Sequence, residues 1–282
     1  MKPQRPFEAD WDYLFVLDAA RYDAFEAVYA DYFDGTLEKR DSEASATPEW
    51  VNEHFDDHYD VTYFSANPFI NSLPYPLKKT GMVSYETTPS EHVSRIVDIW
   101  DDAWDDTLGT VKPEDVNSTF EASDTPETKA IVHYMQPHAP FLGHGKGRIN
   151  KSIQGGFSRL KQTGTIDRLG SVLDDRAPGI IERLEDSEVV MKLAMLSNLD
   201  LGSLSAVLRG GARETLLEYH EDNLRRALDP LTRLASQLDG RIVVTSDHGE
   251  AFGEQGVWGH HVETHIPVLT AVPWLEVDRV TA

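Results

Sequence analysis

The segment RIVVTSDHGE, residues 241–250, carries the clearest structural signal in this sequence. Its first half is a short run of apolar and β-branched residues, which is typical of a strand buried inside a parallel sheet. Its second half turns polar at once and places Asp247 and His248 directly after the strand. Ligands of open parallel sheets bind beyond the carboxyl ends of the strands. The stretch therefore predicts a buried strand that carries a pair of functional side chains at its end.

Two earlier stretches repeat this arrangement. YLFVL, residues 13–17, is an apolar run that stops at Asp18. AIVHYM, residues 130–135, leads into QPHAPF, where two prolines prevent regular strand pairing and leave His138 on a loop. Two more strands are predicted from their apolar residues, DVTYFSAN at residues 60–67 and IPVLTAVPW at residues 266–274.

Helical patterns alternate with these strands. The apolar residues of ARYDAFEAVYADYF, residues 20–33, fall on one face of a helix. The stretch GTLEKRDSEASATPEWV, residues 35–51, is predicted to be a loop that ends where Thr47-Pro48-Glu49 begins a helix, with an N-cap, a proline at the first helical position and an acid in the first turn. Further helices are predicted near residues 90–104, 180–198 and 212–238.

The alternation of strands and helices predicts an α/β fold with a mostly parallel central sheet and helices on both faces. No linker marks a domain boundary, so we expect residues 1–282 to form a single domain. Residues 145–178 are rich in Gly, Ser and mixed charges, and we expect them to form an insertion or a lid.

The chain is strongly acidic. Lysine and arginine total 26, aspartate and glutamate total 48, and the formal net charge is −22, with the acids spread along the whole chain. This charge repels nucleic acid phosphates and anionic lipid heads, so neither is expected as a partner. Because high salt screens such self-repulsion, the composition favours a halophilic, haloarchaeal type of source.

Cysteine is absent from the sequence, which excludes disulfides, thiolate metal ligands and a cysteine nucleophile. No apolar run is long enough for a secretory signal, or for the roughly 20 residues that a membrane helix needs. We therefore expect a cytoplasmic protein without a membrane span, and the sequence leaves its oligomeric state open.

Five side chains with chemical potential follow predicted strands or begin a predicted helix, so the fold brings them to one rim of the sheet. They are Asp18, Thr47, His138, Asp247 and His248. Carboxylate, imidazole and hydroxyl groups together make a ligand set for a divalent metal ion. Each also has a structural alternative, because Asp and Thr are common in helix caps, and an Asp-His pair can form a surface turn.

Three motifs resemble those of the alkaline phosphatase and sulfatase superfamily. VVTSDHGEAFGEQGVWGHH, residues 243–261, followed by IPVLTAVP, is similar to the C-terminal signature of these enzymes. VLDAARYD, residues 16–23, resembles their N-terminal strand with its metal-binding Asp, and HYMQPHAPF, residues 133–141, resembles their strand and histidine loop. The matches span residues 13–273 in the same order, so they imply the fold of the whole domain.

The resemblance implies that Asp18, Asp247 and His248 are ligands of a divalent metal. The superfamily uses Zn, Mn, Mg or Ca, and the imidazole ligand favours Zn or Mn over the harder Ca.

The resemblance also implies that His138 and His261, or alternatively His260, contact a second metal or the anionic oxygens of the substrate. Two-metal members of the superfamily carry an additional Asp with a His four residues on, where this chain has Gln136 and Pro140. The chain is therefore expected to hold one metal tightly and a second, if any, weakly.

The segment expected to carry the nucleophile, residues 45–50, differs from the sulfatase signature. Sulfatases that use formylglycine carry a C/S-x-P-x-R signature, and SATPEW, residues 45–50, lacks the Pro and Arg at those offsets. Thr47 is preferred, since an unmodified Thr or Ser serves in the phosphatase and phosphotransferase branches, and a helix start stabilises an alkoxide and a bound oxyanion. Ser45 is the alternative. Arg21 follows the matched Asp within the same turn and is a candidate catalytic contact to the anion, although a structural ion pair is slightly favoured for it.

The implied function is a metal-dependent hydrolase of sulfate or phosphate esters that works through a covalent Thr or Ser intermediate. Its substrate would be a small molecule, or the ester of a glycan or lipid head group. One alternative is a transferase that passes a phospho-substituent to an alcohol on a glycan or lipid head group. Another is a catalytically inactive sulfatase-like scaffold, because residues 45–50 are atypical.

Lowering the salt concentration to about 0.1 M, where the screening length is about 10 Å, is expected to destabilise the chain through repulsion between its acidic side chains. The melting temperature, measured at about 0.1 M salt and at high salt, reports this effect, and the lower value is expected at low salt. A melting temperature that does not change with salt would contradict the interpretation of a salt-adapted protein.

Overall fold

The computed structural model describes residues 1–76, 86–123, 129–144 and 212–281. The strands of its main sheet are β1 (Lys2–Pro3), β2 (Tyr13–Asp18), β3 (Phe33–Asp41), β4 (Tyr59–Ser65), β5 (Val93–Asp98), β8 (Lys129–Pro137), β9 (Ile242–Ser246) and β12 (Ala271–Val280). Their order across the sheet is β1-β3-β12-β9-β2-β8-β4-β5. Neighbouring strands are parallel except at β12, which is antiparallel to β3 and β9. The predicted mostly parallel sheet is confirmed.

The described helices are α1 (Tyr22–Val28), α2 (Thr47–His54), α3 (Ile99–Asp102), α4 (Pro113–Ala122), α10 (Ala212–Ala235) and α11 (Pro267–Thr270). Short 3-10 turns lie at Tyr29–Asp31, Pro89–Glu91 and Glu254–Gly256. Two small ribbons pair β6 (Trp104–Asp105) with β7 (Thr110–Val111), and β10 (Ala251–Phe252) with β11 (Trp258–Gly259).

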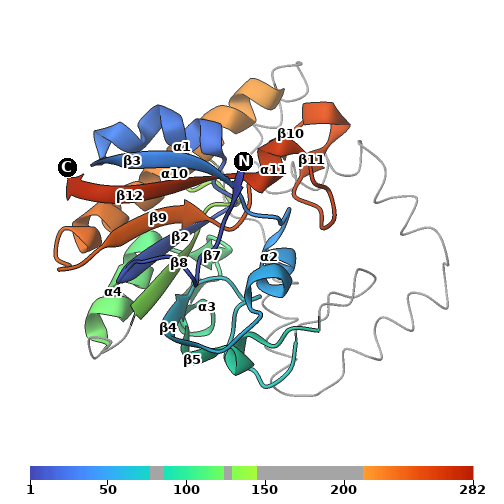
Figure 1. Ribbon diagram of the computed structural model, residues 1–282. Coiled ribbons are helices and arrows are strands. Elements are labelled where there is room, and N and C mark those ends of the chain that lie inside the picture. Colours follow the sequence, from blue (N-terminus) through green and yellow to red (C-terminus); the bar gives the residue numbers. More distant parts are fainter. Residues whose placement is uncertain (77–85, 124–128, 145–211, 282) are drawn as a thin grey trace, which may run out of the picture.

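The central strand β2 shows why helices cover both faces of the sheet. Successive side chains of a strand point to opposite faces. Phe15 and Leu17 join the apolar core that contains the buried side chains of α1, α4 and α10. Leu14 and Val16 join a second core on the other face, together with Trp50 of α2. Figure 1 shows α1 and α10 on one side of the strands and α2 apart from them. The predicted helices on both faces are therefore confirmed.

The sequence predicts a loop at residues 35–51 that ends at the start of a helix. This prediction is wrong for the first part of the stretch, which belongs to β3. The strand pairs with β12 along its length, but on its other side only with the two-residue β1. Most of its side chains therefore stay partly exposed, and the stretch lacks the apolar alternation by which strands are found. Gly35 allows the close approach of β12, since a Cβ there would lie 2.2 Å from the carbonyl oxygen of Glu276.

The prediction of a helix near residues 90–104 is wrong for most of that segment. Residues Val93–Asp98 form β5, and only the single turn of α3 follows. β5 pairs with β4 alone, at the edge of the sheet, so its polar side chains remain exposed. The β-branched residues of this strand favour the extended backbone over a helix.

The long helix α10 confirms the helical prediction for residues 212–238. The predicted helix at 180–198 and the predicted insertion or lid at 145–178 lie outside the described residues. The expectation of a single domain over residues 1–282 also stays a prediction.

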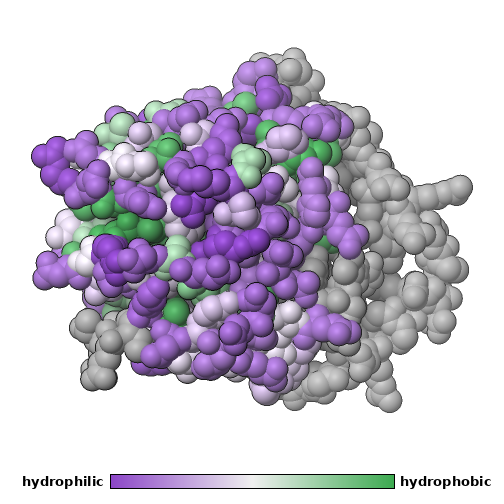
Figure 2. Space-filling view, in the orientation of Figure 1, coloured by the Kyte–Doolittle hydropathy of each residue, from purple (hydrophilic) through white to green (hydrophobic). Residues whose placement is uncertain are grey.

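Hydrophilic residues predominate on the face of the molecule in Figure 2, as the acidic composition predicts. Within the described part of the chain, none of the helices combines the length and the apolar character needed to cross a membrane. The parallel strands β2, β8, β9 and β4 have their carboxyl ends on the same side of the sheet, and the candidate site lies along these strand ends.

Candidate active site

Two buried carboxylates lie side by side at the carboxyl ends of adjacent strands. Leu17 of β2 pairs with Ser246 of β9, so the next residue of each chain segment, Asp18 and Asp247, lies at the same edge. Asp18 is 2% exposed and Asp247 is 0% exposed. The backbone N–H of Ala19 donates to Asp247 Oδ1 at 3.2 Å. The structure thus brings together the two acids that the sequence places at strand ends, with carboxylate oxygens within 4.8 Å of each other.

The imidazole of His248 faces both carboxylates. Its Nε2 lies 3.5 Å from Asp18 Oδ1 and 3.5 Å from Asp247 Oδ2. Its Nδ1 lies 2.8 Å from the carbonyl oxygen of Gly249, which can only accept, so Nδ1 carries a hydrogen. Gly249 has no room for a side chain, since a Cβ there would lie 2.0 Å from the carbonyl oxygen of Val268. This close backbone packing fixes the turn that directs Nε2 at the acids.

Thr47, the first residue of α2, joins the same cluster. Its hydroxyl donates to Asp247 Oδ2 at 2.7 Å and lies 3.4 Å from His248 Nε2. The N-cap position is occupied by Ala46, without a side-chain cap, so the alternative that Thr47 is only an N-cap is not supported. The hydroxyl points to the carboxylates and does not satisfy the helix end.

Three further residues surround the cluster, and sequence reasoning did not single them out: Asn67, His133 and Glu250. Asn67 Nδ2 donates to Asp18 Oδ2 at 2.8 Å and to Thr47 Oγ1 at 3.0 Å. Asn67 lies two residues beyond the end of β4, among turn-forming residues, so no local pattern distinguishes it as a site residue.

His133 lies within β8, where an apolar strand gives no signal of a functional residue. Its Nδ1 lies 2.9 Å from the Tyr63 hydroxyl, and its Nε2 lies 3.7 Å from Asp247 Oδ2. Burial lowers the pKa of His133 to about 4, so the ring is neutral near pH 7. His133 therefore presents a polar ring atom, without charge, to the buried acids.

A divalent cation fits among these side chains. Asp18 Oδ1 is buried and has no hydrogen-bond partner among the described residues. Burial and the neighbouring carboxylate of Asp247 raise the pKa of Asp18 well above its ordinary value. Two buried carboxylates side by side repel each other, and a bound cation removes that cost. The 3.4–3.5 Å separations from His248 Nε2 match the roughly 3.4 Å between ligands of a tetrahedral ion with bonds of about 2.1 Å.

The two acids differ in their electrostatic surroundings. Burial acts to raise the pKa of Asp247, but the neighbouring His248 and His133 and the hydrogen bond from Thr47 outweigh it and lower the pKa. Asp247 is therefore the member of the pair that keeps its charge most firmly. For His248, burial acts to lower the pKa, and the two carboxylates outweigh this effect and raise it.

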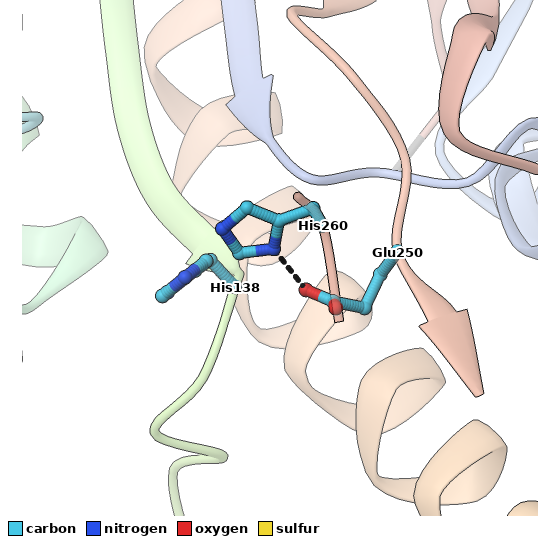
Figure 3. A group of neighbouring side chains, drawn as sticks. All are labelled: His138, Glu250 and His260. Carbon is cyan, nitrogen blue, oxygen red and sulfur yellow. Dashed lines mark hydrogen bonds and ion pairs between the residues drawn. The ribbon is translucent and has the colours of Figure 1, made fainter. Parts of the chain in front are cut away.

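His138, Glu250 and His260 form a second group beside the first. His260 Nδ1 lies 2.8 Å from Glu250 Oε2, and the ring of His138 lies next to that of His260 (Figure 3). The ring centroid of His260 is 4.6 Å from that of His248, so the two groups adjoin. His138 Nδ1 and Glu250 Oε1 are buried without hydrogen-bond partners in the described part of the chain. This group can hold a second cation or contact the oxygens of a bound anion.

Of the two adjacent histidines, His260 takes part in this second group and His261 does not. The carbonyl oxygen of His261 accepts a hydrogen bond from Ser45 Oγ at 2.7 Å. Ser45 Oγ also lies 2.7 Å from Glu49 Oε2, so it links this loop to the first turn of α2. The geometry therefore favours His260 over His261 as a ligand, and Thr47 over Ser45 as the hydroxyl at the acids.

Arg21 is engaged in ion pairs. Its guanidinium forms two bonds to the carboxylate of Asp23, at 2.9 and 2.7 Å, and one to Glu254 Oε1 at 2.8 Å. It also donates to the carbonyl oxygen of Glu250 at 3.0 Å. This arrangement favours the structural alternative for Arg21, which fastens the turn after β2 to the segment that follows β9.

No family model matches this chain, and no curated protein matches it either. Solved structures do match. The periplasmic domain of phosphoethanolamine transferase EptC from Campylobacter jejuni is 14% identical, with a TM-score of 0.44, and the match covers 93% of this chain and 77% of that one. The corresponding domain of EptC from Escherichia coli, in complex with Zn, is 13% identical, with a TM-score of 0.45 and coverage of 99% and 77%.

A third match is a protein of the alkaline phosphatase superfamily from Vibrio parahaemolyticus, the superfamily whose motifs this sequence resembles. It is 10% identical, with a TM-score of 0.38, and the match covers 100% of this chain and 62% of that one. At these identities and TM-scores, function has to be inferred from the site itself.

Replacing Asp247 by Asn is expected to weaken zinc binding by more than about 100-fold. Losing a direct metal ligand lowers the affinity at least as much as losing a residue that orients such a ligand. The Asp247→Asn variant keeps the shape of the side chain and removes its charge. Competition with a chromophoric chelator measures the affinity. Asp10→Asn is the matched control, since Asp10 pairs with Arg241 at the opposite end of β2. Equal zinc affinity of the two variants would contradict the assignment.

Proposed function

We propose that this chain is a metal-dependent enzyme of the alkaline phosphatase and sulfatase superfamily, which moves a phospho-substituent from an ester to an acceptor through a covalent intermediate on Thr47. One observation carries the proposal. The Thr47 hydroxyl, at the start of α2, lies 2.7 Å from Asp247 Oδ2 and 3.4 Å from His248 Nε2, within a buried group that fits a cation. An alcohol in such surroundings is activated for attack.

The neighbours of Thr47 determine the state of its oxygen. Its hydrogen lies in the bond to Asp247 Oδ2, and a lone pair of its oxygen accepts from Asn67 Nδ2 at 3.0 Å. The lowered pKa of Asp247 keeps this carboxylate available as a hydrogen-bond acceptor. The dipole of α2, which begins at Thr47, adds a positive potential that favours an alkoxide. The chain thus orients the oxygen and holds its hydrogen on the side of Asp247.

Asp18, Asp247 and His248, together with the Thr47 hydroxyl, would hold the divalent cation. When bound, the cation would lower the pKa of the hydroxyl and offset the negative charge that develops on the transferred group. Carboxylate and imidazole ligands favour Zn or Mn, with Mg or Ca as less suited ions.

In the first step, a bond forms between Thr47 Oγ1 and phosphorus while the bond from phosphorus to the leaving oxygen breaks. The hydrogen of Thr47 passes to Asp247 Oδ2 along their existing hydrogen bond. The leaving oxygen takes a hydrogen from the imidazolium form of His260, which Glu250 orients and which becomes the neutral imidazole. In the second step, an acceptor oxygen attacks phosphorus and gives its hydrogen to the same imidazole. Thr47 leaves and recovers its own hydrogen.

His138 serves as a contact for the oxygens of the transferred group. Burial lowers its pKa, so the ring is neutral and offers a hydrogen bond without a full charge. Arg21 adds no direct contact in this proposal, because its guanidinium is bonded to Asp23 and Glu254.

The acceptor separates the two enzymatic candidates. With an alcohol on a glycan or lipid head group the enzyme is a transferase, and with water it is a hydrolase. We take transfer as the candidate to test first. Phosphoethanolamine transfer, the activity named for the Campylobacter jejuni structure described above, is a reaction of this class. An inactive scaffold would bind metal and turn over no ester.

Thr47→Ala is expected to reduce turnover of an aryl phosphodiester by at least about 1,000-fold, because loss of a nucleophile removes the covalent route. Mass spectrometry of acid-quenched wild-type protein is expected to show the adduct on the peptide that contains Thr47, and Thr47→Ser should retain it. Ser45→Ala is the matched control. It should keep the adduct, and its turnover should fall far less than that of Thr47→Ala, because Ser45 Oγ bonds to the carbonyl oxygen of His261 and to Glu49. An adduct on Ser45, or full activity of Thr47→Ala, would refute the role of Thr47.

The partition of product between an alcohol and water tests transfer against hydrolysis. As the concentration of an added alcohol rises, the transfer product is expected to increase at the expense of the hydrolysis product, because both arise from one covalent intermediate. Chromatographic quantification of both products checks this. Hydrolysis product alone at every alcohol concentration would identify a hydrolase, and aryl sulfate as a parallel substrate distinguishes sulfate from phosphate esters.

A further inference from the structure

Asn223 of α10 is 0% exposed, and its side-chain amide forms hydrogen bonds to the loop at residues 137–142. Nδ2 donates to the carbonyl oxygens of Pro137 at 3.0 Å and His138 at 3.1 Å, and more weakly to that of Pro140 at 3.4 Å. Oδ1 accepts from the backbone N–H of Leu142 at 3.0 Å. A buried amide is costly unless it is hydrogen-bonded, so these contacts explain why Asn stands at this position.

The loop at residues 137–142 needs such a partner. It begins where β8 ends and contains two prolines, which lack the N–H group that a turn would use to bond its own carbonyl oxygens. Buried carbonyl groups require a donor from elsewhere. The amide of Asn223 supplies donors and an acceptor from a single rigid position on a long helix.

The hydrogen bonds between Asn223 and residues 137–142, which act as a clamp on this loop, help to fix the backbone of His138. The backbone N–H of His138 donates to the carbonyl oxygen of Asp18 at 3.0 Å, while its own carbonyl oxygen accepts from Asn223. His138 is therefore tied on one side to the end of β2 and on the other to α10. Its ring then lies beside His260, with centroids 4.9 Å apart (Figure 3).

A second residue of α10 acts in the same direction. His220, one helical turn before Asn223, is also 0% exposed, and its Nε2 donates to the carbonyl oxygen of Ala19 at 2.9 Å. One face of α10 thus holds both the turn after Asp18 and the loop around His138.

We propose that Asn223 is a positioning residue of the active site, which fixes the imidazole of His138 beside Glu250 and His260 by clamping residues 137–142. The inference rests on the proposed function for what His138 does to the substrate. The location of the ring can be measured independently of that function.

The chain offers a matched control in Asn117 of α4. This asparagine is also buried, at 7% exposed, and it also bonds to α10, through Nδ2 to the carbonyl oxygen of Pro230 at 2.7 Å. Its Oδ1 accepts from the Tyr134 hydroxyl at 2.6 Å. Asn117→Ala removes the same kind of buried amide at a place that does not touch the loop at residues 137–142.

The first measurement is the nuclear magnetic resonance spectrum of the ¹⁵N-labelled histidine rings, with the His138 signal assigned by its absence in His138→Ala. Asn223→Ala is expected to shift the His138 signal, and Asn117→Ala is expected to leave it in place, although both variants lose stability. Asn223→Asp keeps the volume and the acceptor for Leu142 but lacks the amide hydrogens, and it should give the same shift if the alanine variant fails to fold. An unmoved His138 signal in Asn223→Asp would overturn the proposal.

The second measurement is the affinity of the zinc-loaded protein for inorganic phosphate by calorimetry. Asn223→Ala is expected to weaken phosphate binding by about 10-fold or more, which is typical of residues that orient a ligand-contacting group. Because Asn223 acts through His138, the double variant with His138→Ala should bind no more weakly than His138→Ala alone. Additive losses would overturn the proposal. If the wild type binds no phosphate, the proposed function fails, and the ring signal still decides the role of Asn223.

Discussion

The proximity of two buried carboxylates is the constraint on which this structure depends. The parallel pairing of β2 with β9 places Asp18 and Asp247 at the same edge of the sheet, where burial removes the water that would otherwise screen them. The two carboxylates repel each other. The ring of His248 and the hydrogen bonds from Asn67 and Thr47 partly offset this repulsion. A bound divalent cation would complete the compensation. The chemistry proposed for Thr47 follows from the same cause, since its hydroxyl is one of the donors that the acids require.

The sequence predicts those parts of the fold and the site that have a local signal. An apolar run that stops at an acid identifies β2 with Asp18 and β9 with Asp247, and the proline after Thr47 locates the start of α2. Parallel strands end at one edge, so the amino-acid sequence by itself is enough to expect that these residues meet. The roles of the residues come from a resemblance to the alkaline phosphatase and sulfatase superfamily, whose motifs lie on β2, on β8 and at the end of β9.

Other residues of the site have no local signal, because tertiary contacts alone give them a role. His133 lies within an apolar strand, where it is indistinguishable from a core residue, and Asn67 stands among turn-forming residues. The choice between His260 and His261 depends on the path of their loop, which Ser45 anchors to α2. The strands β3 and β5 escape prediction for a related reason, since strands at or near a sheet edge leave many side chains in water and so lack a clear pattern.

The arrangement of strands also sets an order of events when the polypeptide is made. β9 and β12 follow the other strands of the main sheet in the sequence, yet β9 lies between β2 and β12 in the middle of that sheet. The ribosome therefore releases Asp247 and His248 after β1, β2, β3, β4, β5 and β8. In the finished sheet, β9 and β12 lie between β2 and β3. Contacts so distant in sequence form slowly. A metal ion held by both Asp18 and Asp247 would therefore be bound only after β9 has been made and has paired with β2.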